Sequence, residues 1–156
     1  EKGITPVRWT NRGGGAWHQH PGQLAAYPVV PIRPEAGTLD AYRRVLYGTI
    51  SAILTEFQLS GEYHPQLGGV TVDGRQIAAV GIAVKDWIAY HGIVLNVNGL
   101  SEPPLADSSG GLGIESTCMF RELRTPVRTD AVRESFLRHF SQTLGVREYY
   151  LSRVPD

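Results

Sequence analysis

Residues 73–98, DGRQIAAVGIAVKDWIAYHGIVLNVN, constrain the fold of this chain more than any other stretch. Residues 77–84 and 87–97 are short apolar runs rich in valine and isoleucine, which is typical of β-strands. The pair Asp73-Gly74 suits a two-residue turn with positive φ at both positions, so it predicts a hairpin with residues 70–72. The sequence therefore predicts antiparallel strands in which polar groups are set among apolar residues: Gln76, His91, Asn96 and Asn98.

Two longer segments have the three- and four-residue spacing of apolar side chains that predicts amphipathic helices. The first spans residues 38–59, with Thr38 as its N-cap. The second spans residues 129–144, with Thr129 capping its start and Gly145 ending it. The apolar positions are Leu39, Tyr42, Leu46, Ile50, Ile53 and Phe57 in the first helix and Val132, Phe136, Leu137, Phe140 and Leu144 in the second.

The remaining segments are short. Residues 4–9 and 114–120 are candidate strands, and residues 11–15 form a glycine-rich turn. Prolines confine the extended segment 27–32 to a sheet edge or to irregular backbone, while residues 100–113 read as a Pro/Ser/Gly-rich loop. Strands before and between two long helices predict an α+β fold, a mixed sheet with helices packed on it.

Composition narrows the class of protein. The chain has 156 residues, 42% of them hydrophobic, which fits a single domain over residues 1–156. Fifteen basic and fifteen acidic residues cancel, so we expect no nucleic-acid or membrane partner. The single cysteine, Cys118, excludes an internal disulfide and indicates a reducing, cytoplasmic compartment. The only lysines are Lys2 and Lys85, and neither a signal peptide nor a membrane-spanning run is visible.

Four segments, in order, resemble one known family. They are residues 12–23 (RGGGAWHQHPGQ) followed by Tyr27-Pro28, residues 74–81 (GRQIAAVG), residues 91–98 (HGIVLNVN) and residues 108–115 (SSGGLGIE). This pattern is similar to the lipoate-protein ligase B family of lipoyl(octanoyl) transferases. The resemblance implies the biotin/lipoate-ligase α+β fold. The family's opening strands and helix, which normally precede the arginine–glycine–glycine loop, are missing from this sequence, so we expect it to be an N-terminally truncated fragment.

The resemblance also implies a two-step acyl transfer. A cysteine thiolate takes octanoate from octanoyl-acyl carrier protein, and a lysine of a lipoyl domain then attacks the thioester. The acceptors are lipoyl domains of 2-oxoacid dehydrogenase or glycine cleavage proteins, and neither a metal nor a cofactor is implied. The catalytic cysteine's position falls on Ser109 and the catalytic lysine's on Gln76. The family's loop histidine aligns with Gln19, or with His18 or His20 after a one-residue shift.

Both dyad positions have thus changed chemistry. A neighbouring cation activates a thiol by stabilising its thiolate, whereas a serine hydroxyl needs a general base. The amide of Gln76 cannot take up a proton near neutral pH. Among possible substitutes, Cys118 reads as a small buried residue and Lys85 as a solvated turn residue, which leaves His91 as the base that could serve Ser109. The alternative is a core or pocket-lining histidine, which is favoured because no third orienting group and no G-x-S-x-G elbow are evident.

The resemblance places the acyl pocket on three segments, residues 12–23, 79–81 and 91–94, where glycines let backbone groups approach the substrate. The expected binding residues are Arg12, Gly13, Gly14, Gly15, His18, Gln19, His20, Gln23, Ala79, Val80, Gly81, Gly92, Ile93 and Val94.

Other patterns favour structural roles. A metal site on His18, His20, His64 and His91 lacks an acidic or cysteine partner at useful spacing. The glycines at 13–15 lack the lysine and following helix of a phosphate loop. The arginines at 121, 124 and 128 form a solvated rim or, alternatively, a docking patch for acidic acyl carrier protein.

Three functions remain open from the sequence. The first is an octanoyltransferase-type domain with Ser109 and Gln76 at the dyad positions. The second is a non-catalytic module that binds acyl groups or lipoyl domains. The third is an acyl hydrolase that uses Ser109 and His91.

Overall fold

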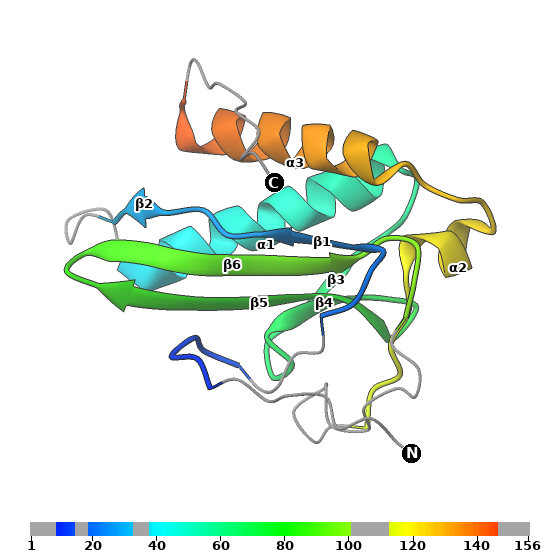
Figure 1. Cartoon of the computed structure of the whole chain (residues 1–156), viewed down its shortest axis with the longest axis horizontal. Coiled ribbons are helices and arrows are strands. Elements are labelled where there is room, and N and C mark those ends of the chain that lie inside the picture. Colours follow the sequence, from blue (N-terminus) through cyan, green and yellow to red (C-terminus); the bar gives the residue numbers. More distant parts are fainter. Residues whose placement is uncertain (1–8, 15–18, 33–37, 101–112, 147–156) are drawn as a thin grey trace.

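The computed structural model describes residues 9–14, 19–32, 38–100 and 113–146. Figure 1 shows a sheet whose one side carries two long helices, α1 and α3, while a short helix, α2, lies at one end. The strands are β1 (Gln23–Ala26), β2 (Val30–Pro31), β3 (Glu62–His64), β4 (Gly69–Val72), β5 (Arg75–Lys85) and β6 (Ile88–Asn96). The helices are α1 (Thr38–Glu56), α2 (Met119–Leu123) and α3 (Thr129–Leu144). The predicted α+β class is confirmed.

The sheet is built around the β5–β6 hairpin. Its strands follow the order β1-β6-β5-β4-β3, and β2 pairs with β6 beyond the end of β1. All of these pairings are antiparallel. Within the described residues, an isolated bridge between Gln76 and Ser116 is parallel, so the sheet is mixed, as predicted.

Two tight turns set the register of β4, β5 and β6. Asp73 and Gly74 join β4 to β5 with φ of 47° and 76°, as the Asp-Gly pair predicts. Asp86 and Trp87 join β5 to β6 with φ of 49° and 62°, at the turn predicted between the apolar runs 77–84 and 87–97, although neither residue is glycine. The resulting hairpin pairs Ala78 through Lys85 with Leu95 through Ile88.

A β-bulge in β5 decides which face of the sheet Gln76 occupies. The register shifts between Val70, which pairs with Ala78, and Thr71, which pairs with Gln76, so Ile77 is the extra residue of β5. Ile77 and Ala78 both belong to the core under the helices. Gln76 instead shares the opposite face with Thr71, which we call the open face of the sheet.

The helices cover the other face. In α1 the buried side chains include Leu46, Ile50, Ile53 and Leu54, each fully shielded from solvent. Burying one such side chain stabilises the fold by about 1.5–3 kcal/mol. The two helices meet through aromatic contacts, because Phe140 of α3 lies edge-on to Tyr42 of α1 with ring centroids 6.5 Å apart. The predicted amphipathic faces are thus confirmed, except that Leu39 is 37% exposed.

Three local expectations are corrected by the structure. The segment 114–120 is not a strand: Ser116 makes only the isolated bridge, and α2 begins at Met119. Thr129 is not the N-cap of α3, since Arg128 holds that position without a side-chain cap bond. Gly145 does end α3, in the left-handed conformation with φ of 69°.

The structure also adds strands that the sequence did not indicate, because β1 lies among glycine and proline residues and β3 has only three residues. The candidate strand 4–9 lies outside the described residues except for Trp9, and the side chain of Thr38 is also outside them, so its capping role stays a prediction. None of the helices in the described ranges is long and apolar enough to cross a membrane.

Candidate functional site

Gln76 lies at the start of β5 on the open face, with a side chain that is only 6% exposed. Its Nε2 donates a long hydrogen bond of 3.5 Å to the carbonyl oxygen of Ala78. Gly69 of β4 leaves the room that this amide occupies, since a Cβ there would stand 3.0 Å from Nε2. Gln76 is thus a neutral, enclosed amide whose Nε2 lies close to Gly69 of β4.

The backbone of Gln76 holds the segment that follows residues 101–112. Its N–H donates to the carbonyl oxygen of Glu115 at 2.8 Å, and its own carbonyl accepts from the N–H of Thr117 at 2.8 Å. Ser109 lies outside the described residues, seven positions before Ser116. The segment from Glu115 to Thr117 is therefore fastened directly beside Gln76.

A chain of amide side chains joins three separate segments next to Gln76. The backbone N–H of His20 donates to Oε1 of Gln23 at 3.1 Å, and Nε2 of Gln23 donates to Oδ1 of Asn96 at 2.8 Å. Asn96 in turn donates from Nδ2 to the carbonyl oxygen of Thr117 at 2.9 Å. Gln23 was expected at the site, whereas Asn96 was noted only as a polar residue in an apolar strand.

An ion pair fixes α2 to the beginning of β5. Arg75 donates two hydrogen bonds to Glu122, at 3.1 Å from Nε and 2.8 Å from an Nη atom. The hydroxyl of Thr117 donates to the same carboxylate. The hydrogen bonds from Arg75, and then that from Thr117, hold the pKa of Glu122 below its usual range. These contacts brace the segment that carries Ser116 from the side of the helix.

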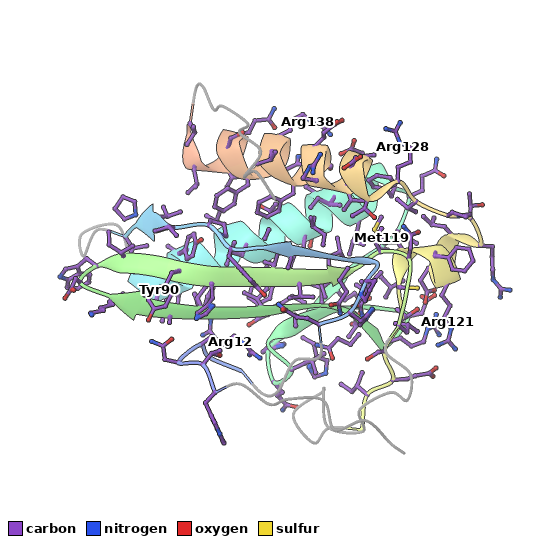
Figure 2. All side chains as sticks on the ribbon, in the orientation of Figure 1. Arg12, Tyr90, Met119, Arg121, Arg128 and Arg138 are labelled. Atoms are coloured by element: carbon purple, nitrogen blue, oxygen red, sulfur yellow. The ribbon has the colours of Figure 1, made fainter. Side chains whose placement is uncertain are left out.

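A second polar cluster lies on β5 and β6 nearer to the Asp86–Trp87 turn. The N–H of Gly13 donates to the carbonyl oxygen of Ile82 at 2.9 Å, and Asn11 donates to the hydroxyl of Tyr90. Figure 2 shows Arg12 and Tyr90 near each other on this side of the sheet. Arg12 is half-buried, and this burial lowers the pKa of its guanidinium group.

His91 belongs to this second cluster. It adopts φ of 60° and packs edge-on against Tyr27, with ring centroids 6.0 Å apart. The hydroxyl of Tyr27 accepts a hydrogen bond from Gln19. His91 pairs with Ile82, six residues along β5 from Gln76. Six residues of strand span about 20 Å, so His91 and Gln76 do not converge.

The expected pocket residues divide between the two faces of the sheet. Val80 and Ile93 belong to the core under the helices. Because side chains alternate along a strand, the intervening positions Ala79, Gly81, Gly92 and Val94 face the open side. Gly92 has a structural reason to lack a side chain, since a Cβ would collide with the carbonyl oxygen of Ala26. Gly15 and His18 lie outside the described residues.

The remaining candidates have clear locations. Lys85 is exposed at the far end of β5 from Gln76, and Cys118 is 3% exposed just before α2. Gly14 has φ of 92° in the turn after Arg12. In the described part of the chain, no three His, Cys, Asp or Glu side chains gather closely enough to hold a metal ion.

Comparison with known proteins supports the family resemblance that the sequence motifs indicate. The sequence matches the lipoyl protein ligase A/B catalytic domain over residues 1–141. It is 36% identical over 152 residues to an octanoyltransferase of Syntrophobacter fumaroxidans, which covers 97% of this chain and 66% of that protein. It is 35% identical over 142 residues to an octanoyltransferase of Synechococcus elongatus, covering 88% of this chain and 59% of the relative. The chain thus spans about two thirds or less of the length of these relatives.

Solved structures agree on the fold. A putative lipoate protein ligase from Thermoplasma acidophilum with bound lipoic acid superposes with a TM-score of 0.69 at 16% identity, over 86% of this chain and 56% of the other. Biotin protein ligase from Aquifex aeolicus gives a TM-score of 0.62 at 16% identity, over 80% of this chain and 53% of the other. At such identities the likeness concerns the fold alone. With the match over residues 1–141, it follows that the chain belongs to the lipoyl protein ligase A/B catalytic domain family.

Proposed function

We propose that this chain is an octanoyltransferase-type domain of lipoate biosynthesis, with Ser109 and Gln76 at the positions of the family's cysteine and lysine. The observation that carries the proposal is the pairing of Gln76 with the segment after the loop of Ser109, through two backbone hydrogen bonds of 2.8 Å. The donor is octanoyl-acyl carrier protein, and the acceptor is a lysine of a lipoyl domain from a 2-oxoacid dehydrogenase or glycine cleavage protein.

The proposed chemistry has two balanced steps. The oxygen of Ser109 attacks the thioester carbonyl carbon, the C–S bond breaks, and the carrier leaves as a free thiol with the serine proton. The amine of the acceptor lysine then attacks the octanoyl ester, the C–O bond breaks, and Ser109 regains its hydroxyl proton. Gln76 takes no proton in either step, since a neutral amide is not a base near pH 7, and it acts as a hydrogen-bond donor.

The chemistry of Gln76 also favours a second candidate, a non-catalytic module that binds acyl groups or lipoyl domains. An enclosed amide offers neither the cation that activates a thiol nor a base for a serine. The third candidate, a Ser109/His91 hydrolase, has no comparable support, because His91 packs on Tyr27 about 20 Å along the sheet from Gln76.

One measurement separates these candidates. The protein is incubated with octanoyl-acyl carrier protein and its intact mass is recorded, alongside Ser109→Ala and Cys118→Ser variants. The transferase proposal expects an octanoyl adduct that Ser109→Ala abolishes and Cys118→Ser preserves. Adding a lipoyl domain then discharges the adduct into an octanoylated lysine.

Other results select the alternatives. Octanoate binding without any adduct supports the binding module and sinks both enzyme candidates. An adduct that water discharges, with a rate that falls in His91→Gln, supports the hydrolase. An adduct that survives Ser109→Ala but disappears in Cys118→Ser shows that the nucleophile was assigned to the wrong residue.

A further inference from the structure

A groove of about 570 Å³ opens where β6 ends against α2. Its lining is Asn98, Gly99, Leu100, Cys118, Phe120, Arg121 and Arg124. The rim residue Asn98 is held in place by hydrogen bonds in both directions with the backbone of Val127, and the N–H of Phe120 donates to the carbonyl oxygen of Val97 at 2.8 Å. The groove is therefore a fixed feature between the sheet and the short helix.

The rim of the groove is cationic. Arg124 lies at the end of α2 in the left-handed conformation, with φ of 57°, and is exposed. Neither its side chain nor that of Arg128 makes a hydrogen bond or ion pair with the described residues. Arg121 is half-exposed and pairs with Glu115 at 2.8 Å at the surface, where such a pair is worth little. Figure 2 shows Arg121 and Arg128 at the same end of the molecule.

Among the described acidic residues, Glu115 pairs with Arg121 at the surface and none pairs with Arg124. Glu122, the only acidic residue of α2, is turned inward and is 9% exposed in its pair with Arg75. The outer side of α2 therefore presents guanidinium groups beside the exposed ring of Phe120, which is 42% exposed. A planar guanidinium matches the oxygen pairs of phosphate, and the apolar floor of Leu100 and Cys118 suits a slender uncharged chain.

The groove adjoins the candidate site through the backbone. Thr117 donates its N–H to the carbonyl oxygen of Gln76, and Cys118, the next residue, lines the groove. Leu100 at the groove is the last described residue before residues 101–112. A ligand that lies in the groove and reaches the arginines is thus beside Cys118, one residue from the backbone bond between Thr117 and Gln76.

We propose that this groove receives the phosphate-linked thioester arm of the acyl donor, with Arg124 and Arg121 holding the phosphate. The inference rests on the proposed function, because it assigns the donor's entry to the same site. Pockets of roughly 300–1,000 Å³ enclose small-molecule groups, so this volume fits the arm and not the folded body of a carrier protein. The acceptor lipoyl domain offers a lysine and no phosphate, which makes it the poorer match for two guanidinium groups.

The test measures binding and does not depend on turnover. Dissociation constants are determined by calorimetry for three probes: acyl carrier protein with its phosphopantetheine arm, the same protein without the arm, and an isolated lipoyl domain. The variants are Arg124→Gln and Arg121→Gln. The matched control is Arg133→Gln, since Arg133 is an equally exposed arginine on α3 that pairs with Asp130 and does not line the groove.

Losing a hydrogen bond to a charged group weakens binding by about tenfold or more. We therefore expect Arg124→Gln to weaken the arm-bearing carrier by about tenfold, with a smaller loss for Arg121→Gln and none for Arg133→Gln. Binding of the armless carrier and of the lipoyl domain stays unchanged. The advantage of the arm also shrinks as ionic strength rises in the wild-type protein.

Equal losses for the carriers with and without the arm overturn the inference, because the arginines then contact the carrier's surface. A loss confined to the lipoyl domain, or no loss at all, overturns it as well. Failure of the proposed function has a different signature, since the arm can bind in an arginine-dependent way while no octanoyl adduct forms. Conversely, an adduct that forms at normal donor affinity in Arg124→Gln leaves the transferase proposal intact and removes this groove from it.

Discussion

Gln76 and Ser116 form a parallel β-bridge, so the strand that carries Gln76 also fastens the chain that leads into α2. The bridge is reinforced by Asn96, which donates to the carbonyl of Thr117, and by Glu122, which accepts from the Thr117 hydroxyl. Gln76 and the chain that leads into α2 thus belong to one hydrogen-bonded unit.

The paired substitution Gln76→Lys with Ser109→Cys should raise octanoyl transfer above that of the natural sequence. A lysine ammonium would stabilise the thiolate of the new cysteine, and a positioned acid–base group contributes roughly 10²–10⁴ in rate. Transfer from octanoyl-acyl carrier protein to a lipoyl domain, followed by mass spectrometry of the acceptor, measures this.

Each single substitution serves as the control for the pair. Ser109→Cys alone lacks the cation and Gln76→Lys alone lacks the thiol, so neither should approach the rate of the double variant. If the double variant folds normally yet transfers no faster than the natural protein, the assignment of these two positions to the dyad is wrong.

Gly69→Ala should destabilise the protein by about 1–3 kcal/mol, the usual cost of overpacking a tight site. Its new Cβ would collide with the carbonyl oxygen of Ala78, a backbone atom that cannot swing away. The Cβ would also stand 3.0 Å from Nε2 of Gln76. Gly48→Ala is the matched control, since a Cβ on that exposed glycine of α1 meets nothing within 4 Å.

The control should stabilise the protein by about 0.5–1 kcal/mol, because alanine is the better helix former. Urea unfolding at constant slope gives both values. Two changes of the same sign would show that the close packing of β4 on β5 is not as described.

Glu122→Gln should cost about 2 kcal/mol of unfolding free energy, since a carboxylate that is 9% exposed loses its charge-assisted hydrogen bonds. The conservative comparison is Glu115→Gln, which removes a surface carboxylate that is 62% exposed in its pair with Arg121. That change should cost less than about 1 kcal/mol. Thermal unfolding of both variants at one pH and salt concentration makes the comparison, and equal losses would contradict the bracing role of Glu122.

Glu56 should make stability fall as the solution is acidified. A hydrogen bond from Ser135, followed by those from Arg138 and His139, lowers the pKa of Glu56 from 4.5 to about 2. Because the folded-state value lies below the unfolded one, the stabilisation is complete above pH 4.5 and is lost as pH falls toward about 2.

The corresponding measurement follows unfolding against pH for the natural protein, Glu56→Gln and Glu134→Gln. Glu56→Gln should be less stable near neutral pH and show a shallower decline on acidification, while Glu134→Gln, an exposed change on α3, should keep the natural profile. If all three proteins gave parallel curves of stability against pH, the carboxylate of Glu56 would not link α1 to α3 as described.

The sequence predicted the elements whose determinants are local. The Asp73-Gly74 turn and the apolar runs after it predicted β4, β5 and β6, and the three- and four-residue spacing of apolar side chains predicted α1 and α3. The segment that begins α2 was wrongly predicted to be a strand. Five residues are too few to show helical spacing, and the N-cap residue, Cys118, makes no side-chain cap bond. Strand β1 was missed because its pairing partner lies on β6, 67 to 73 positions away in the chain.

Only part of the candidate site could be predicted, because the local sequence does not show which distant residues meet in the folded chain. Resemblance pointed to Gln76 and Gln23, but only the folded chain brings Gln23 to Asn96 and Asn96 to Thr117. The separation of His91 from Gln76 depends on hairpin register, which a list of polar residues does not contain. Val80 faces the core and Ala79 faces the open side, and this difference likewise depends on which face of the sheet the helices cover.

The bulge at Ile77 has a consequence for how this protein can change over time. Strict alternation through β5 with all of its residues kept would turn the Gln76 side chain toward the helices, among the apolar side chains of the core. Loss of Ile77 alone would instead remove the bulge and leave Gln76 on the open face, because Gln76 would then directly precede Ala78. We therefore expect any gap within this strand, in a comparison of close relatives, to fall at the bulge.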